Sequence, residues 1–261
     1  MPSSPPVEAA VRVMRLLEAM ASKPVSTVAW LHGELGLPKP SIIRLLQTLE
    51  VCGYVRHAPQ TGAYLLTSRV QVLASGFHGE PLLVEVAAPL LDAFTQRFKW
   101  PAAIAVPEGG AVVVRYSTIS ASPLALLHST IGMRLSLVSR ALGRAYLAFC
   151  EPAEREVLIG LVAASPVEED LPVRRRQTLD ATLELIRRQG YALRDKAVRP
   201  VSRTLAVPVF DANRVVASVG VTWFASTMNE DKAAAAFLEP LQELAQQARA
   251  GLMGKAGSGS V

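Results

Sequence analysis

Few residues of this chain can form covalent or metal cross-links. It has two cysteines, Cys52 and Cys150, among 261 residues, and they do not have the spacing of metal ligands. A disulfide framework is therefore not expected, and both cysteines fit as small core side chains in a reducing compartment. No apolar run is long enough to span a bilayer, and the Pro- and Ser-rich start, residues 1–6, lacks the basic and apolar regions of a signal peptide. These absences favour a cytoplasmic protein without a membrane partner.

The chain is also poor in charge and in the motifs of common enzymes. Only 19% of its residues are charged and 50% are hydrophobic, so we expect a large core and no global disorder. The net charge of +5 is a mild excess that suits a polyanionic partner. The four histidines are scattered, and the sequence has no HExxH pattern, GxSxG elbow or Walker loop. We therefore expect no catalytic site, no metal site and no cofactor.

Residues 26–49 have the pattern of a helix-turn-helix. A short helix is expected over 26–35, and Gly36 provides the flexible backbone of a tight turn. A second helix is expected to begin near Lys39, with Pro40 in its first turn, where the missing N–H costs nothing. Apolar residues recur along this second helix at i, i+3, i+4 and i+7, which predicts one buried face. That face consists of Ile42, Leu45, Leu46 and Leu49.

The opposite face of the second helix is polar and basic, as in helices that contact phosphates and base edges of DNA. Two strands, 53–56 and 63–66, are expected to follow as a hairpin around the turn at 57–62, which makes the module a winged helix-turn-helix. The alternative is a small helical domain with a solvated polar face. The predicted contacts to double-stranded DNA are Ser26, Lys39, Pro40, Ser41, Arg44, Gln47 and Thr48, together with Arg56 and Thr61 from the wing.

The rest of the chain predicts a second, α+β domain. A helix over 67–77 follows the wing, and it could either dock on its own wing domain or pack on its copy in a dimer. We therefore expect a DNA-binding domain at 7–66, a linker helix at 67–80 and a second domain at 81–253. Helices and strands alternate in blocks there, which predicts an antiparallel sheet with helices packed on it. The expected helices are 83–98, 139–149, 153–162, 176–188 and 230–252, and the expected strands are 101–106, 111–116, 124–128, 202–210 and 214–223.

Several short motifs, in this order, resemble the IclR family of bacterial transcription regulators from about residue 7 to residue 252. They are Val11–Glu18, Leu37–Ser41, Arg44–Leu46, Gly53–Val55, Gly132–Leu137, Ala141–Ala145, Gly190–Ala192 and Ala206–Asp211. The resemblance implies a winged helix-turn-helix joined by a linker helix to a GAF-like effector-binding domain, acting as a homodimer or tetramer. Three segments, Gly76–Leu82, Val114–Ile119 and Ala141–Phe149, are similar to the subgroup that regulates breakdown of hydroxyphenylpropionate-type aromatic acids. Members of that subgroup often activate transcription.

The resemblance also implies where an effector binds. It places the cavity between the segment after Gly132 and the two C-terminal strands. The side-chain alternation of a strand puts Ser218, Gly220 and Thr222 on one face, where small polar side chains leave room for a ligand. A polar face turned to solvent is the alternative. The effector-binding residues implied by the resemblance are Met133, Leu135, Thr204, Ser218, Gly220 and Thr222.

One position departs from the family pattern in a way that bears on the effector. Many members carry a small residue or Thr two positions before the Leu-Gly pair at residues 142–143, whereas this chain has Arg140. An arginine near the first turn of a helix could hold a carboxylate by charge-assisted hydrogen bonds, with Ser139 as the N-cap beside it. The alternative is an arginine at the surface or at a dimer interface.

These observations predict a ligand-responsive DNA-binding regulator. Two recognition helices related by a dimer axis would enter successive major grooves of a palindromic operator. A small organic acid, aromatic in the subgroup that the chain resembles, would act through the second domain on the placement of the DNA-binding domains. Two rival interpretations stay open: a constitutive DNA-binding protein without an effector, and an enzyme that uses the second domain.

Overall fold

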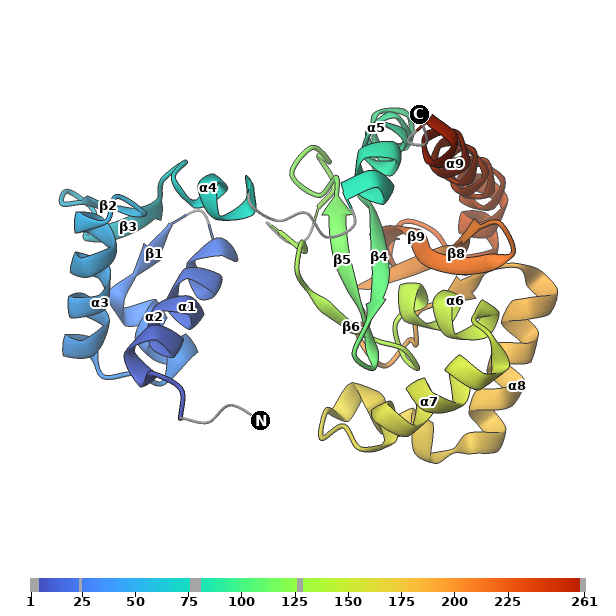
Figure 1. The fold of residues 1–261 in the computed structure, drawn as a ribbon, viewed down its shortest axis with the longest axis horizontal. Helices are drawn as coiled ribbons and strands as arrows, with labels where there is room; N and C mark the ends of the chain where they lie inside the picture. The colour runs from blue at the N-terminus through green and yellow to red at the C-terminus, as the bar shows by residue number, and fades with distance from the viewer. Residues whose placement is uncertain (1–4, 24, 76–80, 126–128, 259–261) are drawn as a thin grey trace. The chain divides into compact units, whose positions relative to one another are not determined.

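The computed structural model describes residues 5–23, 25–75, 81–125 and 129–258 (Figure 1). The chain divides into two compact units, residues 1–79 and 80–261, and each is described here by itself. Within these described residues no helix is both long and apolar enough to cross a membrane.

The first unit is a helical bundle with a small antiparallel sheet of order β1-β3-β2. Its second and third helices form the helix-turn-helix, and Gly36, with a φ of 67°, ends the second helix as the sequence predicts. The fully buried side chains Leu16, Leu31 and Leu46 join the three helices in one core. The elements are α1 (Glu8–Ala21), β1 (Ser26–Thr27), α2 (Val28–Leu35), α3 (Lys39–Val51), β2 (Val55–Ala58), β3 (Ala63–Leu66) and α4 (Val70–Ser75).

The first unit differs from the sequence prediction at four places. The strand expected over 53–56 is β2 at Val55–Ala58, so the turn of the hairpin is shorter than expected. Residues 26–27 pair with β3 as a short strand, so the helix expected from residue 26 begins at Val28. The helix expected over 67–77 is α4 in the described part, and residues 76–80 of the expected linker lie outside the described residues. Cys52 follows the last turn of α3 and is exposed, so it is not a core side chain, whereas Cys150 in the second unit is buried.

The second unit is built on a six-stranded sheet of order β6-β5-β4-β9-β8-β7, and every neighbouring pair is antiparallel. The antiparallel α+β architecture is therefore confirmed. The strands are β4 (Ala102–Glu108), β5 (Ala111–Ser117), β6 (Arg134–Ser136), β7 (Ala192–Leu193), β8 (Ser202–Asp211) and β9 (Arg214–Phe224). The strand expected at 124–128 is not seen at Leu124 and Ala125, and 126–128 lie outside the described residues.

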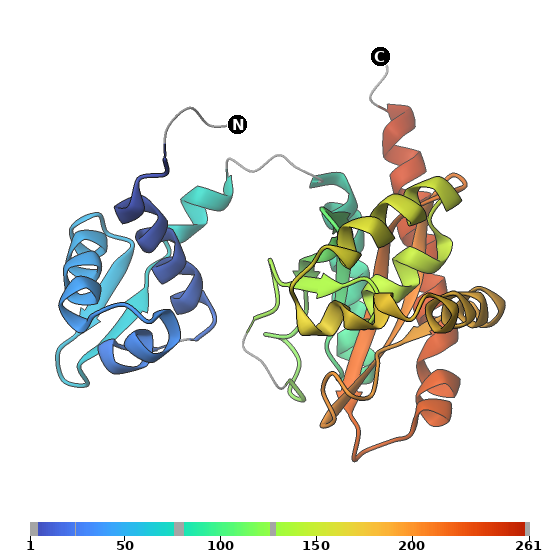
Figure 2. The same cartoon turned by 90° about the horizontal axis from the view of Figure 1, so that it is seen from below.

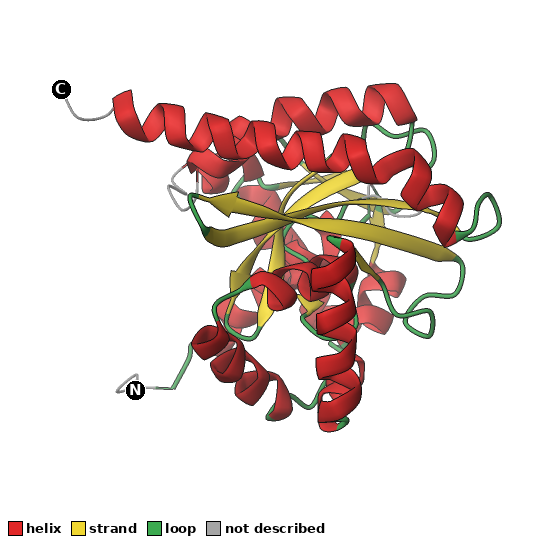
Figure 3. Cartoon of the chain, turned by 90° about the vertical axis from the view of Figure 1, so that its right-hand side faces the viewer, coloured by secondary structure: helices red, strands yellow, loops and turns green. Residues whose placement is uncertain are grey.

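Helices cover both faces of this sheet. The long helices α5 (Pro81–Phe98) and α9 (Glu230–Ser258) lie side by side along one face (Figure 3). The other face carries α6 (Ala141–Phe149), α7 (Pro152–Ala163), the 3-10 helix η1 (Glu168–Arg174) and α8 (Arg176–Gln189), seen in front of the strands in Figure 2. Two separate hydrophobic cores result, one on each face of the sheet.

The side chains of β9 alternate between these two cores as the sequence predicts. Val219 and Val221 belong to the core under α5 and α9. Ser218, Gly220 and Thr222 have the opposite parity and therefore face the α6 side of the sheet. The α6 side is where polar residues and a cavity occur together.

A polar helix face and a cationic cavity

The outer face of α3 is polar and open to solvent. Lys39, Arg44 and Gln47 are exposed there, and neither Lys39 nor Arg44 forms an ion pair within the described part of the chain. Thr48 is exposed too and donates a hydrogen bond to the Arg44 carbonyl oxygen at 2.9 Å, which leaves its oxygen able to accept. Pro40 is exposed and Ser41 is half-buried in the first turn. The apolar residues Ile42, Leu46 and Leu49 hold the opposite side of this helix in the core.

The β2–β3 hairpin is fastened to the same helix. The His57 backbone N–H donates to Oε1 of Glu50 on α3 at 3.1 Å, and the His57 ring stacks on Tyr64 of β3 with ring centroids 4.5 Å apart. Arg56 and Thr61 are exposed on the hairpin, as expected for a wing. This hydrogen bond joins the hairpin to α3, and both elements carry exposed cations and hydroxyls.

Ser26 does not fit the predicted DNA-contacting set. It is 1% exposed, it lies in β1 opposite Tyr64 of β3, and its hydroxyl is buried. A hydroxyl enclosed by the sheet cannot reach a phosphate, so we remove Ser26 from the set. The neighbouring residue, Thr27, has a structural role instead, because its Oγ1 accepts a hydrogen bond from the Trp30 N–H at 3.2 Å and so caps α2.

Replacing Thr27 by alanine should destabilise the first unit by about 1 kcal/mol, because one N–H of the first turn of α2 then loses its acceptor. Thermal unfolding followed by circular dichroism would measure this loss. Thr27→Ser keeps the accepting oxygen and should unfold close to the wild-type temperature. Equal losses in the two variants would show that the hydroxyl does not act as a cap.

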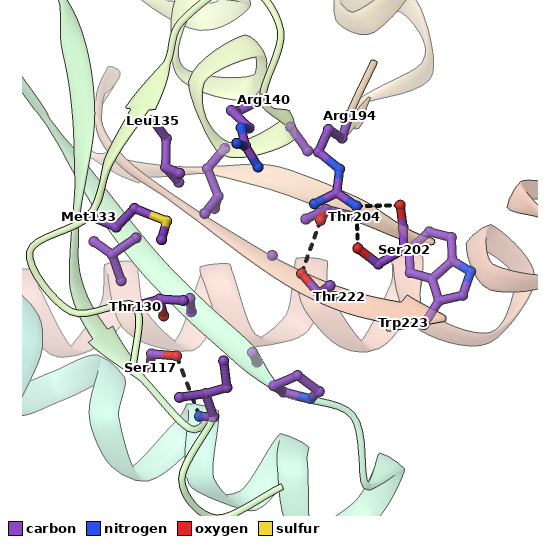
Figure 4. Close-up of a pocket in the computed structure, with 18 of the residues that line it drawn as sticks. Ser117, Thr130, Met133, Leu135, Arg140, Arg194, Ser202, Thr204, Thr222 and Trp223 are labelled. Carbon is purple, nitrogen blue, oxygen red and sulfur yellow. Dashed lines mark hydrogen bonds between the residues drawn. The ribbon is translucent and has the colours of Figure 1, made fainter. Parts of the chain in front are cut away.

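A cavity of about 100 Å³ lies on the α6 side of the large sheet. Its walls come from β4, β5, β8 and β9, from the start of α6 and from the segment between β5 and β6 (Figure 4). The lining is mostly apolar, with Ala103, Val114 and Leu142 among its walls. Six of the eight predicted effector residues line it: Met133, Leu135, Arg140, Thr204, Gly220 and Thr222.

The two other predicted effector residues lie outside this lining. The Ser218 hydroxyl is fully buried and donates to the Leu142 carbonyl oxygen at 2.8 Å, which fixes the first turn of α6 on the sheet. Ser139 is fully buried as well, and it is not the N-cap: α6 begins at Ala141 with Arg140 in the N-cap position, and Arg140 makes no capping bond. Neither serine lines the cavity, so both leave the effector set.

The Arg140 guanidinium lines the cavity but already has a carboxylate partner. Its Nε and Nη2 donate to the two carboxylate oxygens of Glu169 in η1, at 2.7 and 2.5 Å. A bidentate pair of this kind is strong and specific. The cation that we expected to hold an effector carboxylate is therefore neutralised by the protein itself.

A second arginine in the lining, Arg194, has no such partner and was missed from the sequence. It is 6% exposed, and its Nη2 donates to the Ser202 hydroxyl at 2.7 Å and to the Ser202 carbonyl oxygen. Its Nε is buried without a hydrogen-bond partner, and no carboxylate pairs with it among the described residues. Burial, followed by the nearby Arg140 cation, lowers the pKa of Arg194 below its ordinary value. The sequence marks Arg194 only as a charged residue that directly follows the two apolar residues of β7.

Apart from Arg199, which is half-buried and also lines the cavity, the rest of the polar lining is neutral. The hydroxyls of Thr204 and Thr222 lie 2.9 Å apart across β8 and β9, close to Arg194 in Figure 4. Ser117 and Thr130 lie at the end of the cavity away from Arg194 (Figure 4). The cavity thus combines apolar walls, one unpaired buried cation and a few hydroxyls, a combination typical of sites for small organic anions. The described residues contain no cluster of three or more metal-ligating side chains.

Comparison with known proteins matches both units to one family. Residues 9–59 match the IclR helix-turn-helix domain, and residues 81–250 match the bacterial transcriptional regulator IclR C-terminal domain. The DNA-binding transcriptional repressor YiaJ of Escherichia coli (strain K12) is 28% identical over 243 residues, which cover 90% of this chain and 84% of YiaJ.

Two solved structures share the fold over nearly all of the chain. The crystal structure of the Thermotoga maritima IclR has a TM-score of 0.67 at 18% identity, covering 95% of this chain and 99% of that one. An IclR homolog from Microbacterium hydrocarbonoxydans, solved in complex with 4-hydroxybenzoate, has a TM-score of 0.62 at 21% identity, covering 95% of this chain and 100% of that one.

Proposed function

Because this chain belongs to the IclR family of DNA-binding transcriptional regulators, we propose that it controls genes for the breakdown of an aromatic acid and that this acid is its effector. The chain is a regulator and not an enzyme. The effector would bind in the cavity beside α6, and DNA would bind on the polar face of α3. Activation of transcription is the direction that we propose, from the subgroup that the sequence resembles.

The cavity carries this proposal. A buried guanidinium without an acid partner is costly, and an organic carboxylate would supply the missing charge and hydrogen-bond acceptors. The apolar walls favour a carbon skeleton over an inorganic anion. That an IclR homolog was crystallised with 4-hydroxybenzoate supports an acid of this size as the first candidate.

On the DNA side, the proposed contacts are the eight predicted residues that remain after Ser26 is removed: Lys39, Pro40, Ser41, Arg44, Gln47, Thr48, Arg56 and Thr61. We propose a homodimer or tetramer in the cytoplasm, whose paired recognition helices read a palindromic operator. The proposed division of the chain is 7–66 for the DNA-binding domain, 67–80 for the linker and 81–253 for the effector-binding domain. Effector binding would change the DNA affinity by favouring one arrangement of the DNA-binding domains over another.

A thermal-shift screen of the purified full chain tests the effector directly. Hydroxylated benzoates, phenylacetates and phenylpropionates form the panel, with the matching neutral amides as controls. A specific acid should raise the unfolding temperature by about 5–10 °C at a hundredfold excess over its Kd, because it binds only the native state. If no acid in the panel raises the temperature more than its amide does, the chain is better explained as a constitutive DNA binder.

A further inference from the structure

We propose that Arg194 binds the carboxylate of the effector, that Arg144 holds Arg194 in place, and that the effector is a single-ring monocarboxylate with a hydroxyl at its far end. This inference rests on the proposed function, namely that the cavity takes an organic acid. It assigns a binding residue that no sequence pattern singled out, in place of Arg140.

The contrast between the two arginines decides which one is available. Arg140 donates two of its five N–H groups to the two oxygens of Glu169, so its charge is already compensated and a ligand carboxylate would gain less there. Arg194 has an unsatisfied buried Nε, and among the described residues its side chain donates to neutral groups of Ser202 alone. A ligand carboxylate at Arg194 gains a charge-assisted bond and breaks no ion pair.

The charges around Arg194 also favour an anion. Three arginines, Arg140, Arg199 and Arg203, act on its guanidinium with the same sign. Arg140 is paired with Glu169 and Arg203 with Glu230, so Arg199 contributes the uncompensated part of this charge. Arg199 is half-buried, lines the same cavity and has no ion pair among the described residues. In a site of low dielectric constant such repulsion is poorly screened. An entering anion would relieve it.

Arg144 binds the residues on both sides of Arg194. Its Nη1 donates to the carbonyl oxygen of Leu193 at 3.1 Å, and its Nη2 donates to Oδ2 of Asp195 at 3.0 Å. Its Nε donates to the Val138 carbonyl oxygen at 2.7 Å, which ties this clamp to the start of α6. Arg144 is itself largely buried and is compensated by Asp195. It is therefore a positioning residue, which would act on the ligand only through Arg194.

Backbone hydrogen bonds complete the support of this segment. The Asp195 N–H donates to the Ser139 carbonyl oxygen at 2.9 Å, and the Arg194 N–H donates to the Thr204 carbonyl oxygen at 3.1 Å. The Arg194 backbone is thus anchored both to the start of α6 and to β8. A guanidinium on so firmly held a backbone can bind a carboxylate without ordering a loop first.

The shape and lining of the cavity limit the rest of the ligand. A cavity of about 100 Å³ has room for a small molecule, and a single-ring acid is of this kind. The middle of the cavity is apolar, which suits an aromatic ring. At the far end, Ser117 Oγ accepts a hydrogen bond from the Ile119 N–H at 3.4 Å and keeps its own proton for a ligand oxygen. A hydroxyl opposite the carboxylate would meet Ser117 and Thr130.

The test compares 4-hydroxybenzoate with its neutral isostere 4-hydroxybenzamide by isothermal titration of the full chain. Wild type should bind the acid at least tenfold tighter than the amide, and Arg194→Gln should lose this preference while its amide affinity changes less than threefold. Arg194→Lys keeps the charge and should keep part of the preference, which covers the case in which the glutamine variant does not fold. Benzoate, without the distal hydroxyl, should bind the wild type about tenfold more weakly than 4-hydroxybenzoate.

A double-mutant cycle separates positioning from general damage. Arg144→Lys alone should weaken the binding of the acid, and adding it to Arg194→Gln should weaken that binding no further, because it acts through the same bond. Full additivity would reject the role of Arg144. A charge preference that survives in Arg194→Gln would overturn the carboxylate assignment alone. If neither 4-hydroxybenzoate nor any other acid of the panel binds the wild type, the proposed function fails together with this inference.

Discussion

Gly143→Ala should destabilise the second unit by more than about 3 kcal/mol, because the added methyl group has no space. A Cβ atom at this position would lie 2.1 Å from the Ser136 carbonyl oxygen and 2.7 Å from the Leu137 Cα. Both are backbone atoms of β6 and the residue after it, and the fully buried Leu137 fixes them in the core. The backbone of Ser136 and Leu137 cannot move away without disturbing the core, so α6 would have to separate from the sheet.

Gly160→Ala is the matched control, since it makes the same chemical change in a helix of the same unit. A Cβ atom at Gly160 in α7 meets nothing within 4 Å, and the better helix propensity of alanine should stabilise the protein by up to about 1 kcal/mol. Urea unfolding monitored by circular dichroism compares the two variants. Equal midpoints would mean that the close approach of α6 to β6 does not exist in solution.

Replacing both Lys39 and Arg44 by glutamine should weaken binding to the operator more than a hundredfold. The two cations stand on the exposed face of α3, and contacts of such side chains with bases or phosphates contribute about 1–3 kcal/mol each. The slope of log affinity against log salt should also become shallower, by roughly 0.9 for each lost phosphate contact. Fluorescence anisotropy with labelled DNA at several salt concentrations measures both quantities.

The control is a charge-matched pair in the second unit. Arg174 and Arg188 are exposed there, and replacing both by glutamine removes the same net charge. Because this pair lies outside the helix-turn-helix, the operator affinity should change less than threefold. A similar loss in both double variants would mean that α3 contributes only unspecific positive charge, and the recognition role of this helix would have to be given up.

Strong periodic patterns made part of this structure predictable from the sequence. The four-residue apolar pattern of α3 and the alternation in β9 are repeated over several positions, so a single exception does not hide them. The shortest elements could not be found in this way. The strands β1 (Ser26–Thr27) and β7 (Ala192–Leu193) have two residues each. They pair with β3 and β8 through tertiary contacts, which a local sequence pattern does not contain.

The binding residues of the cavity were even harder to predict from local sequence patterns. Arg140 was a reasonable candidate because it departs from a family pattern, but its partner Glu169 lies 29 residues away, and no spacing rule connects the two. Arg194 gave no periodic signal, and its importance depends on burial and on a missing partner. Both properties belong to the folded chain. Sequence could therefore predict the residue types of the site, but it could not predict which cation is left unpaired.

We propose that this protein couples the binding of an acid in the cavity to selective DNA binding through α3. The most direct measurement is the affinity of the full chain for the DNA upstream of its own gene and for a scrambled duplex of equal length, each with and without 4-hydroxybenzoate. We expect at least a hundredfold preference for the upstream DNA at moderate salt and a change of at least fivefold in that affinity when the acid is added. Equal affinity for the two duplexes, with and without the acid, would contradict this claim.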